Sequence, residues 1–277
     1  MFYRMIFFLL IFAAVVTVSA NENVLTVIDT SNGTMGLQKF FGRVFEKENT
    51  ILPQELEINV VTQVWAEIKT IPPSTVVISD GLTVGDMPEN FQKCVYAYTA
   101  VVIAVHKDNP LETLDVSALK RIFSGRAGEW SRVGGSVGKI RLAGCDPESG
   151  IGRVFRKKVM QQDLQVKEES DITKGIAPDM IVCNTAAAAE ALLQTSNDII
   201  VFGSSELLKN AGNNYKILKI ENVLPTRANI VSGKYKLSAE HAVIYNKTAP
   251  PAALKEIISF LKKSVAADMI AAENANP

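Results

Sequence analysis

The chain has 277 residues, of which 47% are hydrophobic and 21% charged, so it can bury a core and does not have the composition of a disordered protein. Its 29 basic and 29 acidic residues balance, which excludes a strong overall attraction to nucleic acid or to an anionic membrane surface. Any anion binding must therefore come from a local site.

Residues 1–20 have the pattern of a secretory signal peptide. Arg4 is their only charge, residues 5–16 are almost wholly apolar, and Val18-Ser19-Ala20 has the small-x-small form of a cleavage site. The apolar run is short for a transmembrane helix, and an uncleaved N-terminal anchor is the alternative. Cleavage would leave 28 basic against 29 acidic residues in an exported, periplasmic protein.

Strand-like and helix-like segments alternate along the rest of the chain. Apolar residues recur at helical spacing in residues 37–48, and Asp115 is placed to cap a helix that ends at Gly125. Ser149-Gly150 opens another helix, and Pro250-Pro251 begins a terminal one. Short apolar runs predict strands at 24–28, 58–62, 76–79, 100–105, 140–144, 198–202, 215–220, 228–231 and 242–245. This alternation predicts an α/β protein whose sheets are mixed or mostly parallel and flanked by helices.

Three cysteines, Cys94, Cys145 and Cys183, match no metal-binding spacing. We expect them to be buried and to behave as small hydrophobic residues, with a single disulfide as the alternative. We expect no cofactor.

Residues 104–114 read AVHKDNPLETL, and residues 122–135 read IFSGRAGEWSRVGG. In order and spacing they resemble the "VVVHPDNP…LT…L..IFSGK…W..VGG" signature of the phosphate-type solute-binding proteins of ABC transporters. Further similar segments follow the family order at 29–32, 77–80, 148–155 and 225–238. The resemblance implies a type II periplasmic binding protein-like fold, in which two α/β lobes are joined by crossover strands with the ligand between them.

The resemblance also implies where a ligand would bind. The expected ligand-binding residues are Thr30, Ser31, Asn32, Ser79, Asp80, Ser149, Gly150, Ile151 and Arg153. A Ser-Gly pair at a helix start offers N–H groups, a hydroxyl and the positive end of the helix dipole to an oxyanion. At the family position matched by Asp80 the carboxylate accepts a hydrogen bond from a protonated oxyanion, which favours hydrogen phosphate over sulfate. Each segment, taken alone, also fits an ordinary helix cap or turn.

Several positions depart from the family pattern. Cys145 stands where the family has an anion-binding Arg, Ile151 replaces a Thr, and residues 58–65 lack the expected Gly-Ser-Gly loop. A hydrogen bond to a charged group contributes about 1.5–3 kcal/mol, so we expect phosphate affinity to be weakened by on the order of a thousandfold. Arg153 could replace the missing Arg, although a solvated cation beside Arg156, Lys157 and Lys158 is the more ordinary interpretation.

Other polar and aromatic residues give no sign of catalysis. Trp65 could line an altered site or simply fill core space. His106 and His241, expected at strand ends, have no partner pattern around them. The chain has no G-x-S-x-G, H-E-x-x-H or P-loop motif, so we do not expect an enzyme.

These observations predict lobe 1 from residues 21–101 and 229–277, and lobe 2 from residues 102–228. We expect a monomer that captures a small oxyanion, phosphate by default, for an ABC permease in the inner membrane. The alternative is a divergent sensor or envelope scaffold that no longer binds phosphate.

Overall fold

A computed structural model describes residues 24–29, 57–62, 75–79, 89–161, 175–247, 251–263 and 269–272. The segments expected to hold the signal peptide and the first helix therefore lie outside the described residues, as does Trp65. Within the described part of the chain, no helix is both long enough and apolar enough to span a membrane.

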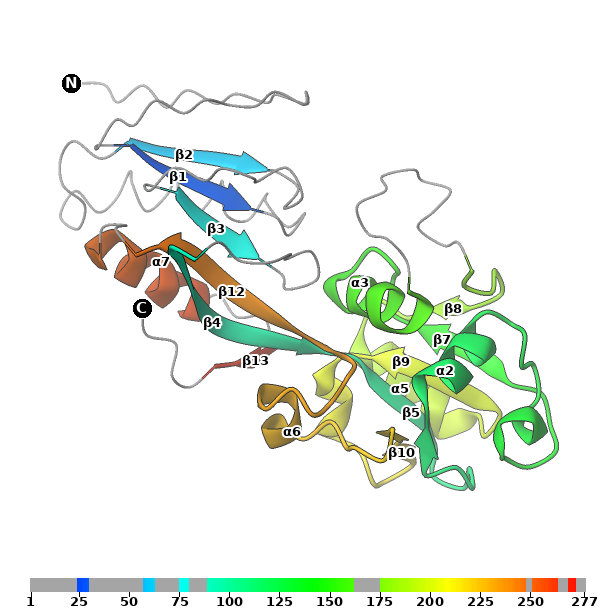
Figure 1. Cartoon of the computed structure of the whole chain (residues 1–277). Coiled ribbons are helices and arrows are strands. Elements are labelled where there is room, and N and C mark those ends of the chain that lie inside the picture. The colour runs from blue at the N-terminus through cyan, green and yellow to red at the C-terminus, as the bar shows by residue number, and fades with distance from the viewer. Residues whose placement is uncertain are drawn as a thin grey trace.

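The described strands form two main sheets, which Figure 1 shows toward opposite ends of the molecule, with β4 and β12 reaching from one toward the other. Sheet A has the order β13-β4-β12-β3-β1-β2. Its strands are β1 (Val24–Asp29), β2 (Glu57–Thr62), β3 (Thr75–Ser79), β4 (Phe91–Ala100), β12 (Ser238–Asn246) and β13 (Met269–Ala271). β1 is parallel to both β2 and β3, whereas β12 is antiparallel to both β3 and β4. Sheet A is therefore mixed.

Sheet B is also mixed and has the order β10-β5-β9-β7-β8. Its strands are β5 (Val102–His106), β7 (Arg141–Gly144), β8 (Ile181–Val182), β9 (Ile199–Gly203) and β10 (Tyr215–Ile217). β7 runs parallel to β8 and β9, whereas β5 is antiparallel to β9 and β10. A small parallel pair is formed by β6 (Thr113–Leu114), which follows β5 in the sequence, and β11 (Lys219–Ile220), which follows β10.

Helices cover both faces of sheet B because their apolar stripes pack on opposite sides of its strands. α2 (Val116–Phe123) and α3 (Gly150–Phe155) contribute Leu119, Phe123 and Phe155 to the larger core. α5 (Ala186–Thr195) packs on the other face. The remaining helical segments are η2 (Trp130–Val133), η3 (Arg156–Met160), η4 (Ser205–Leu208), α6 (Arg227–Val231) and α7 (Pro251–Lys263).

Local sequence signals explain several helix boundaries. The Asp115 carboxylate accepts a 2.6 Å hydrogen bond from the N–H of Ala118, as expected for the cap of α2. Gly125, just beyond α2, has φ +75°, a conformation that glycine adopts without strain. In α7, Leu254, Ile258 and Leu261 are buried on one face.

Three expectations about the strands were wrong. The stretch at 228–231 is helix α6, because the Thr226 hydroxyl accepts a hydrogen bond from Asn229 N–H and caps it. The run at 100–105 is not one strand: it is interrupted at Val101, where the chain passes from sheet A to sheet B. The run at 215–220 is likewise divided between two sheets. β4, which the sequence did not suggest, is the longest described strand of sheet A.

The chain first passes from sheet A to sheet B at a single residue, and it returns to sheet A at the start of β12. Val101 follows β4 and precedes β5, and its N–H donates a 2.8 Å hydrogen bond to the Leu237 carbonyl, next to the start of β12. The core is continuous through this point, since Tyr98, Val101 and Leu237 belong to the same buried cluster as the interior of sheet B. The expected lobe boundaries at 101/102 and 228/229 stay predictions.

The three cysteines form no disulfide bond with one another. Cys94 and Cys183 are buried, as expected, and burial raises the pKa of both. Cys145 is only half-buried, which corrects the expectation that all three would be interior. The expected position of His241 was also wrong, because it lies within β12, where its Nε2 is 2.7 Å from the Thr99 hydroxyl oxygen.

Candidate functional site

The carboxyl ends of strands from both sheets point toward the crossing. In sheet A, β1 and β3 run parallel, and Ser79 at the end of β3 pairs with Ala242, close to the start of β12. In sheet B, Gly203 at the end of β9 pairs with Val102, directly after the crossing, and β7 runs parallel to β9. Ligands of open α/β sheets bind outside such carboxyl ends, so the candidate site lies where the two sets converge.

The expected site residues follow these strand ends. Ser79 is the last residue of β3 and is buried. Ser149, Gly150 and Ile151 follow β7 and begin α3. Figure 1 shows the arrowheads of β1, β2 and β3 directed toward the side of the molecule where α3 lies. Four of the expected residues, Thr30, Ser31, Asn32 and Asp80, lie outside the described residues.

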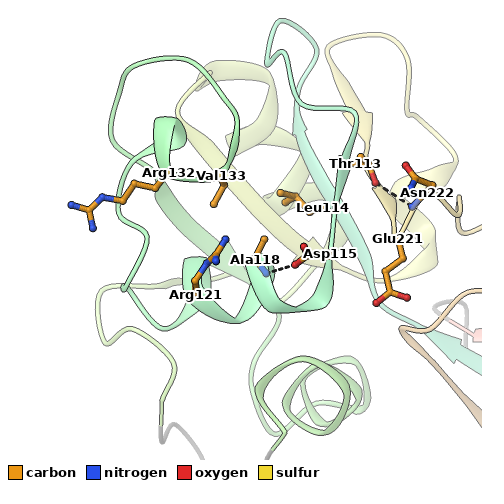
Figure 2. A pocket seen from close by; sticks show the side chains of 9 residues that line it. All are labelled: Thr113, Leu114, Asp115, Ala118, Arg121, Arg132, Val133, Glu221 and Asn222. Atoms are coloured by element: carbon orange, nitrogen blue, oxygen red, sulfur yellow. Dashed lines mark hydrogen bonds between the residues drawn. The ribbon is translucent and has the colours of Figure 1, made fainter.

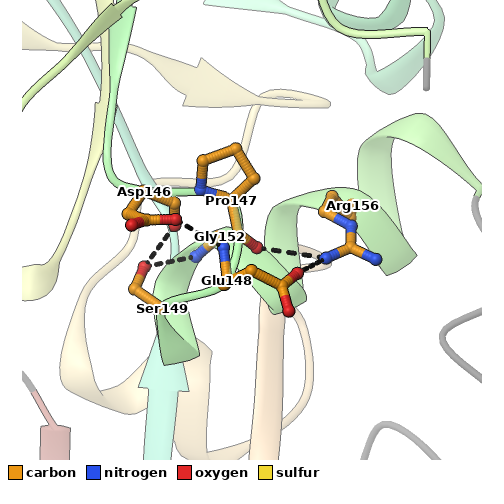
Figure 3. A network of polar contacts seen from close by, with 6 residues as sticks. All are labelled: Asp146, Pro147, Glu148, Ser149, Gly152 and Arg156. Atoms are coloured by element: carbon orange, nitrogen blue, oxygen red, sulfur yellow. Dashed lines mark hydrogen bonds and ion pairs between the residues drawn. The ribbon is translucent and has the colours of Figure 1, made fainter. Parts of the chain in front are cut away.

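Ser149 is the N-cap of α3. Its Oγ accepts a 3.1 Å hydrogen bond from Gly152 N–H, and its hydroxyl donates a 2.6 Å hydrogen bond to the Asp146 carbonyl oxygen (Figure 3). Since a serine hydroxyl has one proton, it has none left for an anion in this arrangement. The ordinary capping interpretation of Ser149 therefore describes the structure, and the expected hydroxyl donor is already in use.

The first two N–H groups of α3 are the donors that remain. Within the described part of the chain, the backbone N–H groups of Gly150 and Ile151 donate no hydrogen bond, as is usual at a helix start. Gly150 is exposed, and a Cβ added there would meet nothing within 4 Å. The Ile151 side chain is buried in the core, so this residue can offer a ligand only its backbone.

Cys145 lies before the turn at 146–149, and Arg153 lies after it in α3. Cys145, at the position of the family Arg, is half-buried against the larger core and supplies no charge. Arg153 is half-buried in the second turn of α3, so it is not the fully solvated cation of the ordinary interpretation.

Arg156 is the residue that sequence reasoning placed wrongly. It was grouped with solvated cations, but its side chain is only 6% exposed and pairs with the Glu148 carboxylate (Figure 3). The same Nη1 donates a 3.3 Å hydrogen bond to the Pro147 carbonyl oxygen. The available sequence signal was the spacing of Ser149, Gly152 and Arg156, which places all three on one helix face.

A separate pocket of about 390 Å³ lies elsewhere in the molecule, between α2, η2 and the turn after β11 (Figure 2). None of the expected site residues lines it. Its charges balance, with Arg121 and Arg132 against Asp115 and Glu221, and Asp115 is engaged in capping α2. Figure 2 shows Arg132 directed away from the other lining residues. We therefore place the candidate site at the strand ends, not here.

The described residues give no sign of metal or nucleophilic chemistry. They contain no cluster of three His, Cys, Asp or Glu side chains able to hold a metal ion. The Ser149 hydroxyl donates to a carbonyl oxygen, which is not a base that could activate it. What the arrangement offers is hydrogen-bond donors at a helix start.

Comparison with known proteins gives a consistent result. A family model described as "PBP superfamily domain" matches residues 86–263, more than half of the chain. The phosphate-binding protein PstS of Borreliella burgdorferi is 20% identical over 192 residues, which cover 69% of this chain and 68% of that protein. PstS of Bacillus subtilis is 25% identical over 167 residues, covering 60% of this chain but only half, 50%, of the relative.

Solved structures share the fold at low sequence identity. A possible phosphate-binding protein from Planctomyces limnophilus superposes with a TM-score of 0.62 at 17% identity, covering 86% of this chain and 87% of that one. PstS from Borrelia burgdorferi superposes with a TM-score of 0.60 at 17% identity, covering 86% of this chain and 92% of that one. These likenesses confirm the expected fold class, the two-lobed α/β architecture of periplasmic binding proteins.

Proposed function

Because this chain belongs to the PBP superfamily domain family, we propose that it is a solute-binding protein that captures a small oxyanion, phosphate first, between its two sheets. One observation supports this most strongly: the carboxyl ends of β3 in sheet A and of β7 and β9 in sheet B converge on one crossing. The relatives named as phosphate-binding proteins support phosphate as the ligand.

The anion would be held mainly by backbone donors from the sheet B side. The N–H groups of Gly150 and Ile151 point outward from the start of α3, where the helix dipole adds a partial positive charge. The bare Cα of Gly150 would allow close approach. From the sheet A side, Ser79, Asp80 and the residues at 30–32 would complete the site, with the Asp80 carboxylate accepting a hydrogen bond from the hydroxyl of hydrogen phosphate.

Binding by such a site would be weaker than a site with an arginine fork. Cys145 supplies no charge, and the Ser149 hydroxyl is engaged in the cap, so two charge-assisted or hydroxyl contacts are missing. Each is worth about 1.5–3 kcal/mol, and about 1.4 kcal/mol corresponds to a factor of ten. We expect a correspondingly modest phosphate affinity.

The finer parts of the proposal concern the cellular role. The protein would be exported through residues 1–20, act in the periplasm as a monomer without a cofactor or catalytic step, and deliver its ligand to an ABC permease. The phosphate-binding names of the relatives support a transport role over an enzymatic one.

Isothermal titration of the purified protein with phosphate, arsenate and sulfate tests the proposal. We expect heat with phosphate and arsenate and none with sulfate. Replacing Cys145 with Arg should tighten phosphate binding by about tenfold or more, because it restores a charged donor to the turn. Absence of heat with millimolar phosphate would reject phosphate as the ligand.

A second candidate follows from the same turn. Cys145 and the buried Ile151 side chain both make it less favourable to a dianion than a Gly-Ser-Gly-Thr turn would be. These features favour a divergent sensor or scaffold that no longer binds phosphate. Permease and ATPase genes beside this one would support transport, and their absence together with no phosphate binding would support the second candidate.

A further inference from the structure

The loop between β7 and α3 contacts the following helix through three residues, Ser149, Gly152 and Arg156, which Figure 3 shows together. Ser149 bonds to the Asp146 carbonyl and to Gly152 N–H. Gly152 lies so close to the loop that an added Cβ would be 2.1 Å from the Asp146 oxygen. Arg156 reaches back to the Pro147 carbonyl and the Glu148 carboxylate.

The contact made by Arg156 differs from the other two because it joins two charges. The Arg156 side chain is 6% exposed, whereas that of Glu148 is 50% exposed, so the guanidinium is inside and the carboxylate is at the surface of the loop. A guanidinium in this position costs desolvation energy unless it is paired, and Glu148 pairs it. The loop therefore loses a favourable contact whenever Glu148 moves away from the helix.

The helix that carries Arg156 is itself firmly held. Phe155, the preceding residue, stacks on Phe202 of β9 with ring centroids 4.0 Å apart and planes 6° apart. It also packs edge-on against Phe123 of α2 at 4.8 Å. Arg156 then begins the π-helical segment η3. The packing of Phe155 thus holds the Arg156 guanidinium in place relative to sheet B. Because the guanidinium binds the loop, the loop is held in place as well.

We propose that Arg156 is a positioning residue, whose ion pair with Glu148 holds the loop at 146–149 so that the N–H groups of Gly150 and Ile151 face the ligand. This inference rests on the function proposed above. An arginine at position 145 would bind the ligand directly. Arg156, which is buried behind the turn, would instead support binding indirectly, by holding the loop. Arg156 touches the loop and not the ligand.

A different role for Glu148 makes the opposite prediction. If its carboxylate only places negative charge beside an anion site, then removing that charge should strengthen phosphate binding. If the ion pair positions the loop, removing the charge should weaken phosphate binding, because the loop is released. Glu148→Gln, which keeps the side chain's size, therefore separates the two roles by the sign of its effect.

The experiment compares wild type, Glu148→Gln, Arg156→Met and the control Glu112→Gln in two measurements. The control removes a carboxylate that pairs with Lys216, away from this loop. We expect phosphate titration to show Kd raised about tenfold in both loop variants and unchanged in the control. Without ligand, amide hydrogen exchange at Ser149 and Gly152 should be about tenfold faster in the loop variants, since local opening governs this exchange.

The two measurements separate this inference from the proposed function. If wild type fails to bind phosphate, the proposed function is rejected, while the exchange measurement still decides whether the pair holds the loop. Unchanged exchange in Glu148→Gln would overturn the inference whatever the ligand. Tighter phosphate binding by Glu148→Gln would overturn it in favour of simple repulsion. Thermal unfolding of each variant checks that the fold is intact.

Discussion

The hydroxyl of Tyr235 donates a 2.8 Å hydrogen bond to the carbonyl oxygen of Val101, the residue at which the chain passes from sheet A to sheet B. Tyr235 is 1% exposed, and Val101 is fully buried. With the bond from Val101 N–H to the Leu237 carbonyl, both backbone polar groups of the crossing residue are satisfied.

Tyr235→Phe should therefore destabilise the protein. It leaves the buried Val101 carbonyl without the hydroxyl, which costs about 1–3 kcal/mol in the free energy of unfolding. Urea denaturation followed by circular dichroism measures this. Tyr245→Phe is the matched control, because the Tyr245 hydroxyl makes a longer, 3.3 Å bond to the Gln92 side chain. Equal losses in the two variants would contradict the special role of the crossing.

Two glycines in α3 should respond differently to alanine. Gly152→Ala places a Cβ 2.1 Å from the Asp146 oxygen and 2.6 Å from Pro147, so the loop must move and thermal stability should fall markedly. Gly150→Ala meets no atom within 4 Å, so it should keep the stability of wild type. Because its methyl group would project where the oxyanion is proposed to approach, Gly150→Ala should weaken phosphate binding. Full phosphate affinity in a stable Gly150→Ala protein would argue against this turn as the site.

Thiol reactivity should single out Cys145. Cys94 and Cys183 are buried and burial raises the pKa of each thiol, so little thiolate is available there, whereas Cys145 is half-buried. A colorimetric thiol assay of the native protein should show one fast-reacting group, which Cys145→Ser should abolish. Saturating phosphate should slow the fast reaction if the turn contacts the ligand. Three equal rates would contradict the burial of Cys94 and Cys183.

Stability should fall at alkaline pH because of two buried tyrosines. Burial raises the pKa of Tyr235, and burial together with the nearby Glu190 raises that of Tyr215, so both stay protonated in the folded state when unfolded tyrosine ionises. Above pH ~10 the free energy of unfolding should then fall by about 1.4 kcal/mol per pH unit for each tyrosine. Below that pH the stabilisation from both tyrosines is fully retained. Urea titrations from pH 8 to 11 measure the slope, which should be smaller in Tyr215→Phe. An identical slope in that variant would contradict the assignment.

Local signals in the sequence predicted the fold class and most elements correctly. Asp115 and Ser149 both cap the helices expected of them, because capping depends on residues only three positions apart. The error at 228–231 arose because β-branched Ile230 and Val231 outweighed the Thr226 cap. The interruption at Val101 could not be seen, since nothing in an apolar run shows which sheet each half joins.

The candidate site was less predictable than the fold. Ser149 and Gly150 were found because they begin a helix, but the internal use of the Ser149 hydroxyl depends on how the preceding loop folds back. The same folding buries Arg156, which in sequence resembles its neighbours Lys157 and Lys158. A charged residue's burial is decided by its partner, and that partner, Glu148, is close only when the loop is formed.

The crossing at Val101 also limits how the molecule can deform. The hydrogen-bond ladder of sheet A stops at the Ala100–Ser238 pair, and that of sheet B starts at the Val102–Gly203 pair. Among the described strands no ladder spans this step, so a rotation of backbone dihedral angles at Val101 and at the return before Ser238 breaks no described strand pairing. The displacement that such a rotation produces increases with distance from Val101. Because the core is continuous through the crossing, only a small rotation at these two connections is compatible with it, and such a rotation would move the start of α3 relative to the end of β3.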